Sequence, residues 1–290
     1  MGCNSKCAYC IVPSVRGREV SRRPGEVVAE VTSLAREGVR EITLLGQNVN
    51  SYGRDLPLDG RIEFAELLRS CDAVGGIERI RFTSPHPKDF RAPVIQPMAE
   101  CGAVCEHAHL PLQSGSTRIL KAMRRTYSRE RYLKLVDELR AGIPDLALTT
   151  DIIVGFPGET EADFAETLEV VEQVGYDSAF TFVYSPRAGT EAAGLPDQVP
   201  EDVKRERIEG LIDVVQRIAA ERNRARIGRL EEVLVEGTSR TGADLLRGRT
   251  RRNTMVNFAG TAAPGELVEV LVEGATSTTL RGTQAALVAA

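Results

Sequence analysis

The sequence predicts an α/β fold, in which parallel strands are joined by crossover helices, followed by a small β-rich module. Three observations support this prediction. Segments with helical and strand periodicity alternate between residues 24 and 186, which is typical of a parallel sheet, either open or closed into a barrel. Glycine or proline turns follow several of the strand segments. From about residue 227 the pattern changes to alternating valines with frequent glycines, which indicates short strands and tight turns.

The expected elements follow one another closely along the chain. The first helix covers residues 23–38, because Pro24 stands in a first-turn position and the apolar residues recur at helical spacing. A short apolar strand at 41–45 ends at Gly46. The alternation continues with a helix near 62–74, a strand at 79–85, a helix near 88–100, a strand at 107–115, helices within 116–140, a strand from 146 and a strand at 177–186.

Two later helices carry clear local signals. Thr160 and Asp163 form a capping box ahead of apolar residues at helical spacing, so we expect a helix to begin there. The charged segment from Glu201 to about Arg226 is expected to be a helix that leads away from the α/β region and closes it.

Length and composition limit the class of protein. At 290 residues the chain is long for one domain, and we predict two, residues 1–226 and residues 227–290, the second a small β-barrel. Apolar residues make up 42% and charged residues 27%, as in soluble globular proteins. No apolar run reaches the ~20 residues of a membrane span and no signal peptide is recognisable, so a cytoplasmic protein without membrane contact is expected. The net charge of −4 gives no overall sign of nucleic-acid binding, which leaves only a local basic surface for that role.

Three of the six cysteines, Cys3, Cys7 and Cys10, lie within eight residues of one another. This grouping indicates metal binding in a reducing compartment rather than a disulfide framework. The spacing C-x3-C-x2-C is not that of a closed four-ligand zinc site or of a bacterial ferredoxin, and it leaves one metal position without a protein ligand. We therefore expect an iron–sulfur cluster with one open iron, and the alternative is a zinc site completed by a distant histidine or cysteine.

A second group of possible ligands is Cys101, Cys105, His107 and His109, which together make a Cys2His2 set. His107 and His109 alternate along an expected strand and point to one face, whereas Cys101 falls near the end of a helix and Cys105 is compatible with simple burial. A structural role is therefore favoured over a metal site here.

Polar residues gather where the expected strands end, the position at which α/β proteins place their ligands. Asp151 is the best single candidate, because a carboxylate within a largely apolar strand needs partners, and a satisfied structural aspartate is the alternative. The full set is Gln47, Asn48, Ser84, His86, Gln113, Ser114, Asp151, Ser185 and Arg187.

The β-rich module contains a basic turn. Arg247, Arg249, Arg251 and Arg252 lie together there, with Phe258 near them, and such a turn on a small barrel is expected to bind the phosphates of RNA, above all through Arg249, Arg251 and Arg252. A solvated charged loop is the alternative.

Several longer strings closely resemble the MiaB-type methylthiotransferases, a branch of the radical S-adenosylmethionine enzymes that thiomethylates a tRNA adenosine. The resemblance extends from Gly2 to the C-terminus. It is carried by GCNSKCAYCIVPSVRGREVSR, LLGQNVNSYG, RFTSPHP, HLPLQSGS, MRRTY, DIIVGFPGET and YSPRAGT. QNVNSYG and TSPHP favour the isopentenyladenosine branch over its sisters that act on threonylcarbamoyl adenosine or ribosomal protein S12. The resemblance implies a partial (β/α)6 barrel and a C-terminal TRAM domain that binds tRNA.

The resemblance also implies a chemistry. A [4Fe-4S] cluster on the three loop cysteines would bind S-adenosylmethionine at its open iron, and an electron from a donor such as flavodoxin or ferredoxin would release a deoxyadenosyl radical. The radical would take hydrogen from C2 of N6-isopentenyladenosine in the tRNA anticodon loop, where a methylthio group is then placed. No residue is assigned an acid–base catalytic role. A non-catalytic, metal-stabilised RNA-binding module is the alternative function.

Motif positions assign residues to the cofactor. Gly46 and Gln47 are expected near the methionine end of S-adenosylmethionine, Gln113 near its ribose, and Asp151 or Val154 near its adenosine. Arg16 and Arg18, which flank the cysteine loop, are expected to contact cofactor or tRNA, and ordinary surface arginines are the alternative.

One feature departs from the resembled family. That family carries an N-terminal domain with three further cysteines and a second cluster, and a first barrel strand ahead of the cysteine loop, whereas this sequence begins at the loop. We therefore expect the chain, taken alone, to lack both, to expose an unpaired strand edge at Ile42–Leu45, and to be incompetent for the full reaction.

Overall fold

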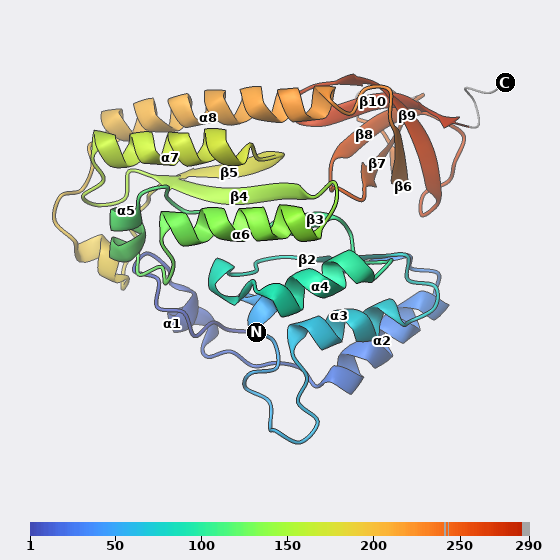
Figure 1. Ribbon diagram of the computed structural model, residues 1–290, viewed down its shortest axis with the longest axis horizontal. Coiled ribbons are helices and arrows are strands. Elements are labelled where there is room, and N and C mark those ends of the chain that lie inside the picture. The colour runs from blue at the N-terminus through green and yellow to red at the C-terminus, as the bar shows by residue number, and fades with distance from the viewer. Residues whose placement is uncertain (241, 243, 286–290) are drawn as a thin grey trace.

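The computed structural model describes residues 1–240, 242 and 244–285. Residues 241, 243 and 286–290, all within the second predicted domain, lie outside the described part of the chain. The chain forms an α/β part and a C-terminal β-barrel, which Figure 1 shows beside one end of the strands. Both the α/β class and the small barrel predicted from the sequence are confirmed.

The strands of the α/β part run parallel. In the described residues they are β1 (Glu41–Leu44), β2 (Arg79–Phe82), β3 (His107–His109), β4 (Ala147–Val154) and β5 (Ser178–Val183). β1 pairs with β2, and β3, β4 and β5 pair in that order. One parallel bridge, from Ile80 to Val104, connects the two sets. The other edge of β1 pairs with no strand among the described residues, as expected for the edge at Ile42.

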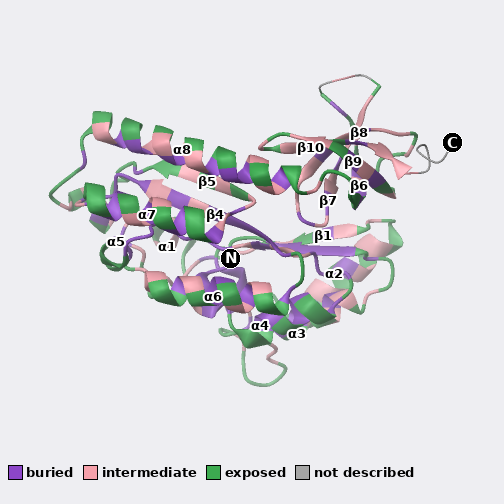
Figure 2. Ribbon diagram, turned by 45° about the horizontal axis from the view of Figure 1, so that its top comes forward, coloured by how far each residue is buried: buried purple, intermediate pink, exposed green. Residues whose placement is uncertain are grey.

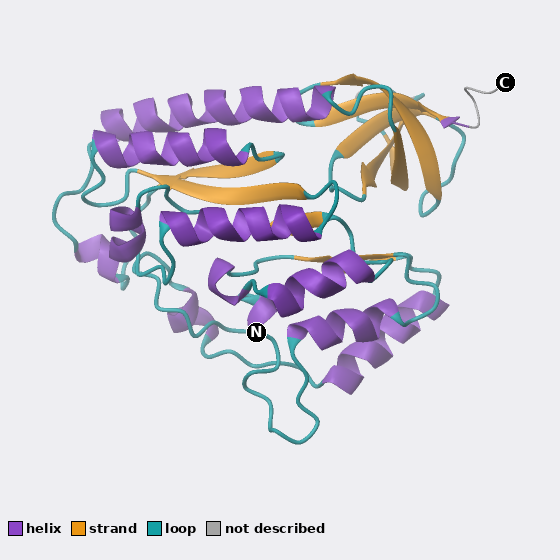
Figure 3. Ribbon diagram, in the orientation of Figure 1, coloured by secondary structure: helices purple, strands orange, loops and turns teal. Residues whose placement is uncertain are grey.

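Helices connect and cover these strands, as Figure 3 shows. None of the described helices is both long and apolar enough to span a membrane. The α-helices are α1 (Val12–Arg16), α2 (Pro24–Arg36), α3 (Phe64–Asp72), α4 (Ala92–Glu100), α5 (Thr117–Ala122), α6 (Arg129–Gly142), α7 (Glu161–Val174) and α8 (Glu201–Arg224), and the 3-10 turns are η1 (Val49–Ser51), η2 (Pro87–Asp89) and η3 (Glu191–Gly194).

Local sequence explains most of the helix boundaries. α7 begins with the predicted capping box, in which Thr160 and Asp163 each accept from the other's backbone N–H. The helix expected near 88–100 is divided, because proline in the first turn starts both η2 and α4. α8 does not lead away from the sheet as expected: it lies along β5 and α7, and its last turns approach the β-barrel.

The strands and helices enclose a core on one face of the sheet. Residues such as Ile80, Leu148 and Ile152 pack there with residues from the helices, and Figure 2 shows the buried strands beneath partly exposed helices. Because side chains alternate along a strand, the intervening residues face the opposite, open side of the sheet.

The C-terminal barrel closes around its own small core. Its strands are β6 (Leu230–Thr238), β7 (Leu246–Thr250), β8 (Met255–Ala259), β9 (Leu267–Ala275) and β10 (Thr279–Gln284), hydrogen-bonded in the closed order β10-β8-β7-β6-β9. Buried valines together with Phe258 and Leu280 fill its interior, which is separate from the core of the α/β part.

Four arginines, which we call the interdomain arginines, join the barrel to the starts of the α/β strands. They are Arg79 and Arg81 on β2, and Arg251 and Arg252 after β7. The Arg79 side chain is 0% exposed and donates to the Arg249 carbonyl at 2.7 Å and the Glu232 carbonyl at 2.8 Å. Arg81 donates to the carbonyls of Thr250 and Arg251, both at 2.8 Å.

The other two interdomain arginines reach in the opposite direction. Arg251 donates to both carboxylate oxygens of Glu106 at 2.8 Å and to the Val104 carbonyl at 2.9 Å. Burial raises the pKa of Glu106, but the hydrogen bond and the charge of Arg251, together with a backbone hydrogen bond, hold that pKa below its usual value. Arg252 pairs with Asp177 at 2.6 Å and with Asp145 at 3.1 Å. The barrel is therefore held by charge-assisted hydrogen bonds, which are stronger than neutral ones.

We predict that Arg79→Met lowers the free energy of unfolding by about 2–4 kcal/mol, because it leaves buried carbonyl acceptors and Glu232 without their donor. Arg69→Met is the matched control, since Arg69 forms only an exposed pair with Glu100 and its loss should cost within about 0.5 kcal/mol. Urea unfolding measures both, and equal losses in the two variants would contradict this role of Arg79.

Candidate functional site

The loop that carries Cys3, Cys7 and Cys10 is closed at its base by backbone contacts. Cys3 N–H donates to the Gly17 carbonyl at 3.1 Å. Gly2 has φ of 78°, and a Cβ added there would lie 2.0 Å from the Arg18 carbonyl oxygen, so this position requires glycine. Arg16 and Arg18 are exposed beside this closure.

The same loop docks onto the carboxyl ends of the strands. Ala8 N–H donates to the Met123 carbonyl at 3.0 Å, and Ala8 packs in a small cluster with Phe156 and Tyr184, which follow β4 and β5. In Figure 1, α1 and α5 lie at this end, opposite the β-barrel. The cysteine loop and the barrel therefore occupy opposite ends of the strands.

The three loop cysteines are free and partly exposed. Burial raises the pKa of the Cys10 thiol, a hydrogen bond from Val12 N–H lowers it, and the neighbouring Cys7 and Cys3 raise it further, so the three sulfurs are electrostatic neighbours. Among the described residues, no group of three or more His, Cys, Asp or Glu side chains is arranged closely enough to hold one metal ion. The donor set fits an iron–sulfur cluster, because thiolates are its usual ligands, and the assignment stays a prediction.

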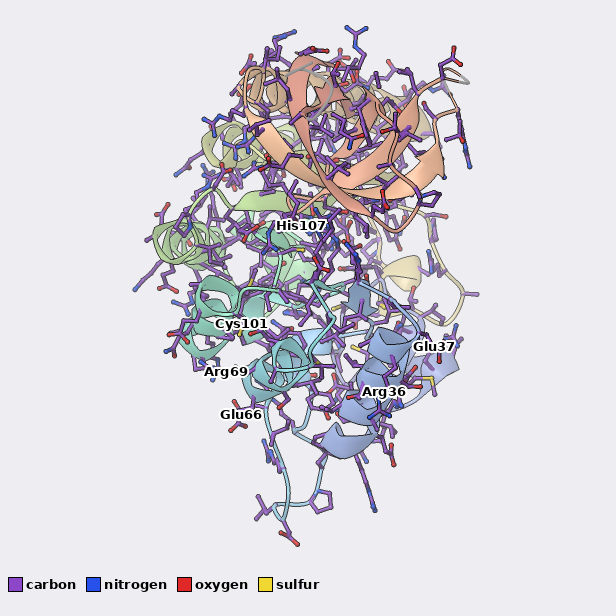
Figure 4. All side chains as sticks on the ribbon, turned by 90° about the vertical axis from the view of Figure 1, so that its right-hand side faces the viewer. Arg36, Glu37, Glu66, Arg69, Cys101 and His107 are labelled. Carbon is purple, nitrogen blue, oxygen red and sulfur yellow. The ribbon has the colours of Figure 1, made fainter. Side chains whose placement is uncertain are left out.

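The remaining cysteines have different surroundings. Cys71, Cys101 and Cys105 are buried, and burial raises the pKa of the Cys71 thiol to about 11. In Figure 4, Cys101 is labelled among the helices, whereas His107 is labelled close beneath the β-barrel. The Cys2His2 set considered from the sequence is therefore not assembled in the described structure.

A polar network runs along the open face of β3 and β4. His107 Nε2 and His109 Nδ1 each lie 3.0 Å from the Thr149 hydroxyl oxygen, and His109 Nε2 lies 3.3 Å from Asp151 Oδ2. The two histidines thus share one face, as predicted from their alternation. Burial lowers the pKa of His107 to about 3, with the charges of Arg81, His109, Arg252 and Arg249 adding to the effect.

A cavity of about 520 Å³ opens over this network, between the sheet and the β-barrel. That volume falls in the usual range for small-molecule sites. Phe180 of β5 lines it with 60% of its surface exposed, and its ring lies edge-on to His109 with centroids 6.1 Å apart. Asp151 and Arg249 line the same cavity, as do Ser277 and Thr278 of the barrel.

Gly46 and Gln47 line a different cavity, of about 480 Å³, beside β1 and the start of the cysteine loop. A Cβ on Gly46 would lie 3.0 Å from Val49 Cα, so the backbone turns tightly there. The structure therefore does not bring Gly46 and Gln47 into one cavity with Asp151.

Gln113 lies between these regions, where β3 continues alongside β4. Its N–H donates to the Asp151 carbonyl at 2.8 Å, and its φ of 68° is left-handed, a strained conformation for a residue other than glycine. The Val154 side chain is fully buried in the helix-side core and its carbonyl accepts from Tyr184 N–H. Asp151 faces the open side and Val154 does not.

The three arginines predicted to bind RNA have unequal surroundings. Arg251 and Arg252 are interdomain arginines, and the Arg252 side chain is only 9% exposed. Arg249 is 39% exposed, pairs with Glu236 at 3.0 Å and faces the larger cavity. The alternative of a solvated charged loop does not describe Arg251 and Arg252 either, because both are engaged by the α/β part.

Sequence reasoning missed Arg125, Tyr127 and Phe180 as site residues. Arg125 and Tyr127 lie in the string MRRTY, whose only signal in the sequence is its resemblance to the family, and Arg125 contacts Cys7. Phe180 falls in the strand expected at 177–186, where sequence gives no sign of exposure, because its exposure depends on the open face of the sheet.

Two family models match the chain. Residues 1–171, more than half of the chain, match the family model of the radical SAM superfamily, and the chain belongs to that superfamily. Residues 224–284 match the TRAM domain. Membership implies an iron–sulfur cluster and S-adenosylmethionine as cofactors, as predicted from the sequence.

Curated relatives show which members of the superfamily this chain resembles in sequence. A protein of Clostridium botulinum (strain Hall) named tRNA-2-methylthio-N(6)-dimethylallyladenosine synthase is 55% identical over 282 residues, which are 97% of this chain and 62% of that protein. A protein of Mycobacterium marinum named tRNA-2-methylthio-N(6)-dimethylallyladenosine synthase 1 is 52% identical, over 95% of this chain and 56% of that protein. The chain thus spans about three fifths of the length of the relatives it matches.

The similarity of this chain to solved structures supports only the assignment of its fold. Coproporphyrinogen III oxidase from Escherichia coli, a radical SAM enzyme, matches with a TM-score of 0.52 at 14% identity, over 86% of this chain and 65% of that one. The radical S-adenosylmethionine methyltransferase TsrM from Kitasatospora setae matches with a TM-score of 0.53 at 19% identity, over 66% and 37%.

We predict a pH-dependent stability that comes from His107. The folded chain holds His107 neutral, whereas the unfolded chain binds a proton below about pH 6.5. Its contribution is therefore complete above pH 6.5 and is lost as the pH falls towards 3. Between these limits the free energy of unfolding of the wild type should fall more steeply than that of His107→Gln, by up to about 1.4 kcal/mol per pH unit. Parallel curves from urea unfolding at each pH would show that His107 does not titrate in this way.

Proposed function

We propose that this chain carries the catalytic and RNA-binding parts of a radical S-adenosylmethionine methylthiotransferase that acts on N6-dimethylallyladenosine in the anticodon loop of tRNA. The observation that carries the proposal is the three-cysteine loop at the carboxyl ends of the strands, next to an open face bordered by a TRAM domain. The relatives' names support the adenosine substrate and not threonylcarbamoyl adenosine, ribosomal protein S12 or a non-catalytic module.

The cofactors would be held at that end of the sheet. Cys3, Cys7 and Cys10 would bind the cluster, which leaves a fourth iron free for S-adenosylmethionine. When bound, the pair supplies the one-electron chemistry needed to remove hydrogen from an unactivated carbon such as adenine C2. Gly46 and Gln47, which line a cavity beside the start of the loop, and the strained turn at Gln113 would contact S-adenosylmethionine.

The larger cavity would receive the target base. A base acted on by an enzyme must leave its stack, and an exposed aromatic ring such as Phe180 replaces part of the lost stacking, worth about 1–3 kcal/mol per base. Asp151 and His109 supply acceptors and donors to the edge of a purine. These side chains would orient the base in the cavity. The carboxyl ends of the strands lie towards the cysteine loop.

Arg249 is the best placed of the three predicted arginines for a phosphate, because it is partly exposed at the rim of that cavity. An RNA contact by Arg251 or Arg252 would require each to leave its carboxylate partners. We propose that these two act on RNA binding only by holding the barrel in place.

The remaining partners follow from the chemistry. The one-electron reaction needs an electron donor, for which a flavodoxin or ferredoxin is suited. The six free cysteines fit a reducing compartment, so we propose that the protein works in the cytoplasm.

The iron test compares two sets of cysteines within the same chain. After anaerobic reconstitution with iron and sulfide, the wild type should hold about 4 irons and absorb visible light. Cys3→Ala, Cys7→Ala and Cys10→Ala should each lose most of this iron, because each removes a ligand. Cys71→Ala, Cys101→Ala and Cys105→Ala should keep it, because these thiols are buried away from the loop.

Two results would contradict the proposal. One is a chain that binds zinc and shows no visible absorbance. The other is a Cys105→Ala variant that loses iron as completely as Cys7→Ala.

A further inference from the structure

Arg125 is brought to the cysteine loop by the end of α5. Arg124 adopts φ of 57°, and Arg125 N–H donates to the Leu120 carbonyl at 2.8 Å. This left-handed turn ends the helix in the manner of a Schellman motif and turns the chain back towards the loop. Because Ala8 N–H donates to the Met123 carbonyl in the same turn, the loop and Arg125 are positioned by one piece of backbone.

The Arg125 guanidinium bridges the loop to the end of β3. Its Nη1 lies 3.4 Å from Cys7 Sγ, and its Nε donates to the Tyr127 hydroxyl oxygen at 3.0 Å. The Tyr127 hydroxyl donates in turn towards the carbonyls of Pro111 and Leu112, at 2.9 and 3.1 Å. Arg125 also stacks over the Tyr127 ring, 5.1 Å from its centroid, so that its orientation is fixed on two sides.

The charge of Arg125 has no carboxylate partner. Among the described residues no Asp or Glu forms an ion pair with it, whereas its neighbour Arg124 pairs with Glu191 at 2.6 Å and Arg118 pairs with Asp163. A partly buried cation is costly unless an anion or hydrogen-bond acceptors compensate for it. Apart from the neutral Tyr127, the acceptor that Arg125 contacts is the sulfur of Cys7, which becomes anionic when it binds a metal.

We propose that Arg125 is a positioning residue that compensates the charge of an iron–sulfur cluster held by Cys7 and raises its reduction potential. The inference rests on the proposed function, since it requires the cluster. Reduction adds one electron and therefore one negative charge, without making or breaking a bond. A fixed cation beside a ligating sulfur stabilises that added charge, and hydrogen bonds to the sulfurs are among the factors that set such potentials.

The test is a redox titration of the reconstituted chain with a chemical one-electron reductant and mediators, followed by electron paramagnetic resonance and visible absorbance. Arg125→Met keeps much of the side-chain volume over Tyr127 but removes the charge and the donors. It should make reduction about tenfold less favourable, a shift of about 59 mV to more negative potential for one electron. Arg125→Lys keeps the charge and should restore most of the shift.

Arg124→Met is the matched control, because it removes an adjacent arginine whose charge is already paired with Glu191. Its midpoint should equal that of the wild type. Equal midpoints for Arg125→Met and the wild type would overturn the proposal, as would an equal shift in Arg124→Met.

The iron content of the variants and of the wild type distinguishes three further outcomes. If Arg125→Met binds no iron and Arg125→Lys binds it normally, the charge is required and the proposal stands. If neither binds iron, the guanidinium has only a structural role and the proposal fails. If the wild type itself binds no iron, the proposed function fails first, so the two failures are distinguishable.

Discussion

The arrangement of this molecule depends on the exchange of arginine hydrogen bonds between the β-barrel and the amino ends of the α/β strands. Arg79 and Arg81 reach into the barrel, and Arg251 and Arg252 reach out of it, so neither part can shift without leaving buried partners unpaired. With the barrel fixed at one end, the carboxyl ends of the strands remain at the other. The open face between the two ends is bordered at one end by the barrel and continues towards the cysteine loop at the other.

The two ends of the sheet therefore have different surroundings, with the barrel at the amino ends of the strands and the cysteine loop at their carboxyl ends. Parallel strands bring their carboxyl ends to one edge, where the loops can carry ligands for a cofactor without disturbing the core. The cysteine loop takes this place by packing Ala8 against residues that follow β4 and β5, and Arg125 adds a cation on the sheet side of Cys7. The cavity beside the barrel holds Phe180, His109 and Asp151, which suit a flat, polar-edged ligand. In the proposed function, cofactor and base would therefore be approached from different ends of one face.

The fold was largely predictable because its signals are local. Strand and helix alternation, the capping box at Thr160 and the glycine-rich β module all depend on neighbours in sequence, and most elements formed close to their expected places, although the helix expected near 88–100 is divided and α8 packs along the sheet. The three loop cysteines were recognisable for the same reason. The partners of Arg251 and Arg252 were not predictable, because a run of arginines looks alike in sequence whether it faces solvent or a carboxylate from a distant strand. The resemblance assigned Asp151 or Val154 to the adenosine of S-adenosylmethionine, and strand alternation places Val154 in the core and Asp151 on the open face.

The central claim is that chemistry at the cysteine loop is directed at an adenine base on the open face. Its most direct test is hydrogen transfer within the reconstituted chain. The chain would be given S-adenosylmethionine, a reductant and a tRNA anticodon stem-loop whose N6-dimethylallyladenosine carries deuterium at C2. The account predicts 5′-deoxyadenosine one mass unit heavier, because the deuterium atom moves from C2 to the 5′ carbon. Unlabelled 5′-deoxyadenosine, formed at the same rate with and without the RNA, would contradict it.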